Sequence, residues 1–174
     1  DMVFETPYII KDIPANRDPK ATGLVSLLDN RVVRILPNGL SSTFNQIAFE
    51  ILDEQGLKSV RSMPINYSPS DEKLEILSVT TTKKDGTVRT LYKTSEFNMA
   101  DDSIRMYYDQ RQIVIEVPDL AIGDRIEYRF KRTQMQRASS SVAFFSDLYQ
   151  LQTWFNRQWS RYTVIAPESF NIHL

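Results

Sequence analysis

Two runs of alternating apolar and polar residues stand out between residues 107 and 131, YYDQRQIVIEVPDLAIGDRIEYRFK. Each run has apolar side chains at every second position: Ile113, Ile115 and Val117, then Ile126, Tyr128 and Phe130. This period of two is the one a pleated strand imposes, with one face apolar and the other largely polar. Residues 118–124, between the runs, contain Pro118 and Gly123 and favour a turn. The pattern predicts a long amphipathic β-hairpin whose apolar face needs cover.

Similar alternation recurs along most of the chain, separated by turn signals. We expect strands over residues 24–36, 41–52, 60–67, 73–83, 87–92, 143–155 and 159–166. Asn38-Gly39 and Asp85-Gly86 are strong hairpin turns, because these residues reach positive φ at little cost. Residues 93–106 lack a clear period and are expected to form a loop, and no stretch carries a convincing amphipathic helix. About eight or nine short strands with such turns predict an all-β fold, an antiparallel β-sandwich.

The chain length fits one domain, since 174 residues bury a sizeable core without disulfides or metals. Residues 1–23 carry Pro7, Pro14 and Pro19, which prevent a helix, and we expect an extended N-terminal arm lying on the core. Residues 24–174 are expected to form the single sandwich domain. The chain begins at Asp1 without an initiator methionine, and we interpret it as an excerpt of a longer chain.

Composition restricts the possible chemistry. There is no cysteine, and the one histidine, His173, lies beside the C-terminus. Thiol nucleophiles and Cys-ligated zinc are therefore excluded within these residues, and a His-based triad or multi-His metal site is not expected. We predict no catalytic residue, no cofactor and no metal ion. The net charge of -1 gives no global field for nucleic acid, and no run of about 18 apolar residues predicts a membrane span.

An aromatic cluster follows residue 143, and its rings are open to three interpretations. They could belong to the core, form a docking face for a neighbouring domain, or stack on sugar rings. The candidate residues for partner or ligand binding are Trp154, Phe155, Trp159 and Tyr162. Exposed and roughly coplanar rings at Trp154, Trp159 and Tyr162 would favour the carbohydrate platform.

Charged residues offer three weaker candidates. Asp101, Asp102 and Asp109 could bind a hard cation, but their spacing matches no calcium loop, and solvated loop charge is favoured. Glu116 and Glu127 could act as a pair of glycosidase carboxylates, yet we expect both to have cross-strand partners on a solvated face. A basic stretch could contact nucleic acid or lipid phosphates, although strand amphipathicity alone explains it: Arg125, Arg129, Lys131, Arg132 and Arg137.

The order of several short motifs resembles the DUF3857 family over residues 24–167. These motifs are PNG at 37–39, DEQGL at 53–57, KLEI at 73–76, KDGTV at 84–88, YYD at 107–109 and GDRIEY at 123–128. The resemblance implies an immunoglobulin-like β-sandwich that precedes a transglutaminase-like, papain-type cysteine catalytic domain in bacterial, often exported proteins. A catalytic thiolate needs a cysteine, so no catalytic residue of that neighbour can be carried over to this chain.

The resemblance therefore implies a non-catalytic accessory domain. It would position the adjacent catalytic domain or bind a protein or peptide partner, in an exported periplasmic or cell-envelope location. The alternative is an independent carbohydrate-binding module that uses the C-terminal aromatic cluster. No nucleic-acid partner is expected under either interpretation.

Overall fold

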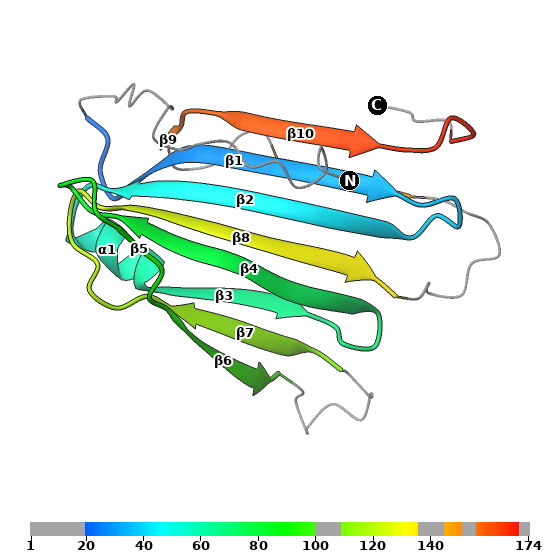
Figure 1. Cartoon of the computed structure of the whole chain (residues 1–174), viewed down its shortest axis with the longest axis horizontal. Coiled ribbons are helices and arrows are strands. Elements are labelled where there is room, and N and C mark those ends of the chain that lie inside the picture. Colours follow the sequence, from blue (N-terminus) through cyan, green and yellow to red (C-terminus); the bar gives the residue numbers. More distant parts are fainter. Residues whose placement is uncertain (1–19, 100–108, 136–144, 151–155, 171–174) are drawn as a thin grey trace.

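The computed structural model describes residues 20–99, 109–135, 145–150 and 156–170. These residues form ten strands and one short helix, shown in Figure 1. The elements are β1 (Leu24–Ile35), β2 (Ser41–Ile51), α1 (Glu54–Arg61), β3 (Ser62–Tyr67), β4 (Glu72–Thr82), β5 (Val88–Arg89), β6 (Lys93–Asn98), β7 (Arg111–Glu116), β8 (Arg125–Gln134), β9 (Asn156–Arg157) and β10 (Ser160–Ile165). They form two sheets, and the predicted all-β sandwich is confirmed.

The two sheets differ in size. The large sheet has seven strands in the order β10-β1-β2-β8-β4-β5, with β9 also beside β1, and the small sheet has the order β3-β7-β6. All pairings are antiparallel except those of β9 and β10, which run parallel to β1. Figure 1 shows the small sheet toward the β4 end of the large sheet, with β1 and β10 at the opposite end. The small sheet therefore covers only part of its larger neighbour.

The main hydrophobic core lies between the sheets. It joins Ile115 and Val117, at the end of β7 and just after it, to Ile126, Tyr128 and Phe130 of β8, as the alternation predicted. Tyr128 is 1% exposed and its hydroxyl donates to the carbonyl of Val60 at 2.8 Å, which satisfies the one polar atom of a buried ring. Burial raises the pKa of Tyr128 above its usual range. The ring therefore stays neutral and ties α1 to the large sheet.

The predicted central hairpin is wrong, although both of its strands exist. β7 pairs with β3 and β6 in the small sheet, whereas β8 pairs with β2 and β4 in the large one. The connection crosses between sheets, and Val117 and Leu120 within it are buried in the core. Two amphipathic strands can bury their apolar faces by facing each other across a sandwich as well as by lying side by side. Alternation alone does not distinguish these arrangements.

Two further local predictions are corrected. Residues 54–61 form α1 where no helix was expected, because Asp53 caps it by accepting from the amides of Gln55 at 2.9 Å and Gly56 at 3.0 Å. Residues 93–98 form β6 where a loop was expected, paired along its length with β7. A helix of eight residues is too short for its period to stand out in the sequence, and β6 is a polar edge strand without the alternation on which the prediction depended.

The C-terminal strands were predicted only in part. Residues 145–150 form no strand, whereas β10 lies within the predicted 159–166. The expected N-terminal arm falls almost entirely outside the described residues. The expected turns at Gly39 and Gly86 are confirmed, with φ of 76° and 85°. Within the described ranges, no helix is long and apolar enough to cross a membrane.

Candidate functional site

The predicted aromatic site is only partly within the described residues. Trp154 and Phe155 lie outside them. Trp159 precedes β10 and is 43% exposed, whereas Tyr162 lies within β10 and is half-buried. None of the described aromatic residues from 145 to 162 belongs to the hydrophobic core clusters. This leaves docking and ligand binding open for Trp159 and Tyr162.

Residues 145–150, here called the strap, lie against β1 and β10. The ring of Tyr149 in the strap stacks on Tyr162 with centroids 5.0 Å apart and an interplanar angle of 27°. The carboxylate of Asp147 accepts a hydrogen bond from the Tyr162 hydroxyl at 2.8 Å and pairs with Arg31 at 3.1 Å. One face of Tyr162 is therefore covered by another ring, and its hydroxyl is already bound.

The electrostatics of the strap support this arrangement. Burial, followed by the hydrogen bond to Asp147, raises the pKa of Tyr162 to about 12. Burial also raises the pKa of Tyr149, whose hydroxyl is bonded to Ser160. Arg157 donates to the Gln150 carbonyl at 2.9 Å and pairs with Asp29 at 2.9 Å. Contacts at Asp147, Tyr149 and Gln150 thus tie the strap to β1, β9 and β10, and the raised pKa values keep Tyr149 and Tyr162 neutral at physiological pH.

A polar groove lies on the large sheet beside the strap. Its volume is about 400 Å³. Its lining comes from the large sheet, the start of β4 and the strap: Arg31, Ser41, Thr43, Asn45, Glu72, Phe130, Arg132, Gln134, Phe145, Ser146 and Asp147. Arg31 pairs with Asp147 on one wall, and Arg132 pairs with Glu72 at 2.9 Å on the other. The charges of the groove are thus neutralised internally, and its floor offers hydroxyl and amide groups.

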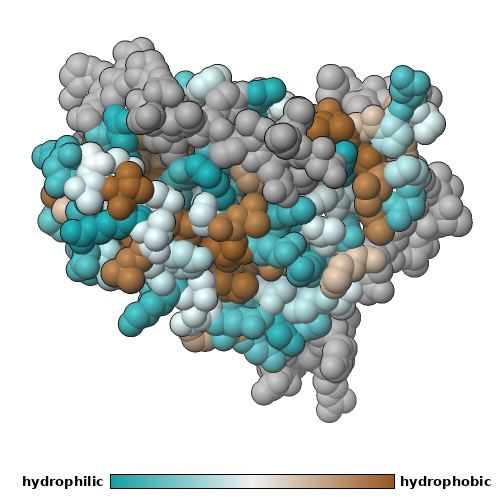
Figure 2. All heavy atoms as spheres, viewed as in Figure 1, coloured by the Kyte–Doolittle hydropathy of each residue, from teal (hydrophilic) through white to brown (hydrophobic). Residues whose placement is uncertain are grey.

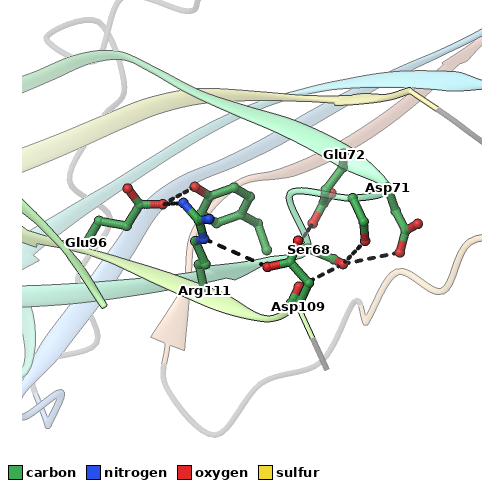
Figure 3. Close-up of polar contacts among 8 residues, drawn as sticks. Ser68, Asp71, Glu72, Glu96, Asp109 and Arg111 are labelled. Carbon is green, nitrogen blue, oxygen red and sulfur yellow. Dashed lines mark hydrogen bonds and ion pairs between the residues drawn. The ribbon is translucent and has the colours of Figure 1, made fainter. Parts of the chain in front are cut away.

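Sequence reasoning missed a second polar network, which lies on the small sheet (Figure 3). Glu96 of β6 accepts from the hydroxyl of Tyr67 in β3 and from Arg111 of β7 at 3.3 Å, so one carboxylate joins all three strands. Arg111 also lies 3.8 Å from Asp109. Cross-strand register would have revealed this triad, but no alternation in residues 93–98 marks them as a strand.

The pKa values in this network show which contacts dominate. The hydrogen bond from Tyr67, then that from Arg111, lowers the pKa of Glu96. The hydrogen bond between Tyr67 and Glu96 also raises the pKa of Tyr67, and the hydrogen bond between Arg111 and Glu96 raises the pKa of Arg111. Glu96 is therefore an acceptor that fixes β6 on its neighbours rather than a proton donor for chemistry.

A turn beside this network gathers several acidic groups around Ser68 (Figure 3). The Ser68 hydroxyl lies 3.2 Å from the carboxylate of Asp71 and 3.0 Å from the carbonyl of Asp109, and the Ser68 amide donates to Glu72 at 3.4 Å. Across the described ranges, no group of three or more His, Cys, Asp or Glu side chains could hold a metal ion. Asp101 and Asp102 lie outside those ranges. The turn is thus a hydrogen-bonded structural feature.

The two candidate glycosidase carboxylates do not share a site. Glu116 is exposed on β7 of the small sheet, whereas Glu127 is 7% exposed on β8 of the large sheet. Glu127 accepts from Gln46 at 2.6 Å and from Arg129 at 2.6 Å, and Gln46 in turn accepts from Asn30 at 3.3 Å. The expectation of a solvated face is wrong for Glu127, because this polar row is buried on the face of the large sheet opposite the core.

The basic stretch is largely neutralised within the domain. Arg125 lies 3.5 Å from Glu50, Arg129 pairs with Glu127 and Arg132 pairs with Glu72. Arg137 falls outside the described residues. Arginines that are already paired with carboxylates are poor ligands for phosphate, so this surface does not favour nucleic-acid binding.

Exposed apolar side chains are scattered rather than gathered. Figure 2 shows hydrophobic residues at several separate places on the face seen in Figure 1, each bordered by hydrophilic ones. Among the described residues, the large exposed apolar side chains are Leu77, Val88, Leu91, Phe97, Met99, Ile122, Met135, Leu148 and Trp159. Phe97 and Met99 lie at the end of β6, on the edge of the small sheet.

Comparison with known proteins places this architecture in a family. A model described as "Domain of Unknown Function with solved-structure structure (DUF3857)" matches residues 37–174. A search of curated proteins gives no match.

Two solved structures superpose on part of this chain. A crystal structure of "a putative protease" from Parabacteroides distasonis superposes with a TM-score of 0.58 at 18% sequence identity, over 66% of this chain and 24% of that chain. The CBM3a-L domain from scaffoldin cipA of Clostridium thermocellum superposes with a TM-score of 0.37 at 10% identity, over 68% of this chain and 71% of that chain. This chain thus corresponds to about a quarter of the length of the longer protease.

Proposed function

We propose that this chain, which belongs to the DUF3857 family, is a non-catalytic accessory β-sandwich domain of a larger, transglutaminase-like protein with a papain-type cysteine catalytic domain. It positions that catalytic domain or binds a protein or peptide partner. The observation that carries the proposal is the similarity in fold to 24% of a much longer chain described as a protease. The remainder of such a chain has room for further domains.

The chemistry of the described residues supports an accessory role. A papain-type mechanism needs a thiolate and a histidine base within hydrogen-bond reach. The sequence contains no cysteine, and its carboxylates Glu96 and Glu127 serve as acceptors in structural networks. The thiolate of the proposed reaction has to come from another part of the protein.

The polar groove is the surface we propose for contact with the neighbouring domain. Interfaces between domains of one chain are typically more polar than obligate protein interfaces. The groove presents Thr43, Asn45 and Ser41 on a rigid sheet, with its two arginines held by carboxylates on the walls. Such a surface suits a polar, uncharged contact that fixes orientation.

The intact mass and peptide map of the native protein test the accessory role. We expect a longer product in which a cysteine and, later, a histidine and an aspartate follow residue 174. A native product that ends near Leu174 would contradict the proposal. We also propose an exported location, which fractionation of the source cells into cytoplasm and envelope tests directly.

A carbohydrate-binding module is a second candidate, favoured by the 43% exposure of Trp159. Stacking on a sugar needs an exposed aromatic ring, and one face of Tyr162 is already covered by Tyr149. Titration with soluble oligosaccharides tests this candidate. Binding that is lost in Trp159→Ala and retained in Tyr162→Phe would favour it over the accessory role.

A further inference from the structure

The small sheet has two edges, β3 and β6, because its order is β3-β7-β6. An edge strand presents backbone groups that can pair with an additional strand. Within the part of the chain that the structure describes, no strand pairs with β6 on the side away from β7. All six residues of β6 are exposed.

One hydrogen bond beside β6 shows its hydrogen-bond phase, that is, which of its residues bond to β7 and which face the open edge. The amide of Met99 donates to the carbonyl of Gln110 at 2.9 Å, in register with the β6–β7 pairing. Hydrogen-bonded pairs recur at every second position of an antiparallel ladder. Residues 93, 95 and 97 therefore bond to β7. The amide and carbonyl groups of Thr94 and Glu96 point toward the open edge.

The opposite side of β7 confirms this phase. The amide of Val117 donates to the carbonyl of Arg61 at 3.1 Å, so Ile113 and Ile115 bond to β3. A central strand bonds alternately to its two neighbours. The residues of β7 between them, including Val114, accordingly bond to β6.

The two edges are protected very differently. In the same phase, Pro64 of β3 points its nitrogen away from β7, and proline has no N–H to offer a new strand. The next outward carbonyl on β3, that of Asn66, already accepts from Arg132 at 2.8 Å. β6 contains no proline and no bulge, and its register with β7 is continuous. The β3 edge is therefore blocked to a new strand, whereas the β6 edge is regular.

β6 is also held in the shape that strand addition requires. Glu96 joins Tyr67 of β3 and Arg111 of β7 on the face of the small sheet that turns toward the large sheet. An edge fixed in an extended conformation loses less conformational entropy when another strand pairs with it.

We propose that the open edge of β6 binds an extended peptide segment of a partner protein by strand addition. The inference deepens the proposed function, on which it rests, because it names where a peptide partner binds and by which groups. Backbone bonds to Thr94 and Glu96 supply affinity, and the alternate side chains supply selectivity. Phe97 is 51% exposed, so we expect an apolar residue opposite it in the bound segment. In an antiparallel segment the residue four positions after that one lies opposite Lys93, and we expect it to be acidic.

A second copy of the chain fits this edge less well. Two antiparallel self-pairings with equal overlap fit the observed phase, and neither gives Phe97 an apolar neighbour or Lys93 an acidic one: one sets Lys93 opposite Phe97, and the other sets Glu96 directly opposite Glu96 of the other copy. Like charges directly opposite one another destabilise a strand pair. A foreign segment with a basic or neutral residue at that position avoids the repulsion.

Fluorescence anisotropy with the 174-residue chain and the labelled peptide VTIKSTE tests the proposal. The peptide places isoleucine opposite Phe97, lysine opposite Glu96 and glutamate opposite Lys93. The control peptide has the same sequence with N-methyl groups on its lysine and its last threonine, which remove the two amides that face Glu96 and Thr94. We expect the control to bind roughly tenfold more weakly or worse.

Matched variants of the protein complete the test. Thr94→Pro removes an outward amide without removing a bond to β7, and we expect it to weaken peptide binding about tenfold. Thr94→Val keeps that amide and should change the affinity less than about twofold. Amide shifts in the NMR spectrum of the complex are expected at Thr94 and Glu96.

Several results would overturn the inference. They are absence of binding, equal binding of the N-methylated peptide, amide shifts at Asn45 in the groove instead of β6, and a dimer in analytical ultracentrifugation that Thr94→Pro converts to monomer. The accessory role would survive each of them, since it is tested by the native mass and not by peptide binding.

Discussion

Gly56 lies so close to Gly23 that a Cβ atom on Gly56 would sit 1.9 Å from the Gly23 carbonyl oxygen. That oxygen accepts from the amide of Leu52 at 3.0 Å, and the Gly23 amide donates to Asp53 at 2.7 Å. The first turn of α1 therefore packs directly on the backbone that leads into β1. This junction joins the helix to the large sheet and leaves no room for a side chain.

Gly56→Ala should lower the free energy of unfolding by about 3 kcal/mol, because the methyl group meets backbone that cannot move aside. Helix propensity alone would favour alanine by about 1 kcal/mol, so the sign of the change discriminates between the two effects. Urea unfolding measures it. Gly86→Ala is the control: φ is 85° but nothing lies within 4 Å, so only about 1 kcal/mol of backbone strain is expected. Equal losses in both variants would contradict the packing argument.

Asp53 should make stability depend on pH in the acid range. The amides of Gly56 and Gly23 donate to its carboxylate and lower its pKa below the ordinary value of 3.8. A lowered pKa means that the stabilisation is present above pH 3.8 and is lost as the pH falls through the lower, folded value. Asp53→Asn cannot accept at both oxygens, and we expect it to be less stable than the parent at pH 7.

The control for Asp53 is the same comparison at low pH. Urea unfolding of the two proteins at pH 7 and near pH 2 should show a difference that shrinks in acid, because the parent carboxyl is then protonated as well. Glu54, the neighbouring carboxylate in the first turn of α1, provides a matched variant, Glu54→Gln. A difference for Asp53→Asn that stays constant with pH would show that the charge of the carboxylate has no role.

Much of the fold could be predicted from the sequence because it depends on local signals. The β1–β2 turn follows from Asn38-Gly39, where Gly39 has φ of 76°, and the buried faces of β7 and β8 follow from the period of two. The motif order also identified the family. The turns and the buried strand faces need only neighbouring residues to be read correctly.

The features that were missed depend on distant residues. β7 faces β8 rather than pairing with it because β3 and β6 occupy the two edges of β7, and β2 and β4 occupy the two edges of β8. The parallel pairing of β10 with β1 joins residues about 130 positions apart, and no local pattern encodes it. The triad of Tyr67, Glu96 and Arg111 requires the register of three strands, so the candidate partner site on β6 could be found only from the structure.

Glu127 should be more sensitive to substitution than Glu116. Replacing Glu127 by leucine removes this acceptor from the buried amide of Gln46 and from the partly buried Arg129, which costs about 3 kcal/mol. Glu127→Gln keeps an acceptor but not the charge, and should cost about 1 kcal/mol. Thermal or urea unfolding measures both. Glu116→Leu, at an exposed position, should change stability by less than about 0.5 kcal/mol.

Tyr162 should make stability fall in the alkaline range. Burial and the bond to Asp147 raise its pKa to about 12, so the neutral phenol is favoured in the folded protein. A raised pKa means that the stabilisation is complete below the ordinary value of 10 and is lost as the pH rises toward 12. Tyr162→Phe has no proton to lose, and its unfolding free energy should decline less steeply across this interval. Asp147→Asn removes one of the two causes while keeping burial, so its slope should lie between those of the parent and Tyr162→Phe. Identical slopes in all three proteins would mean that the strap does not hold Tyr162 in its neutral form.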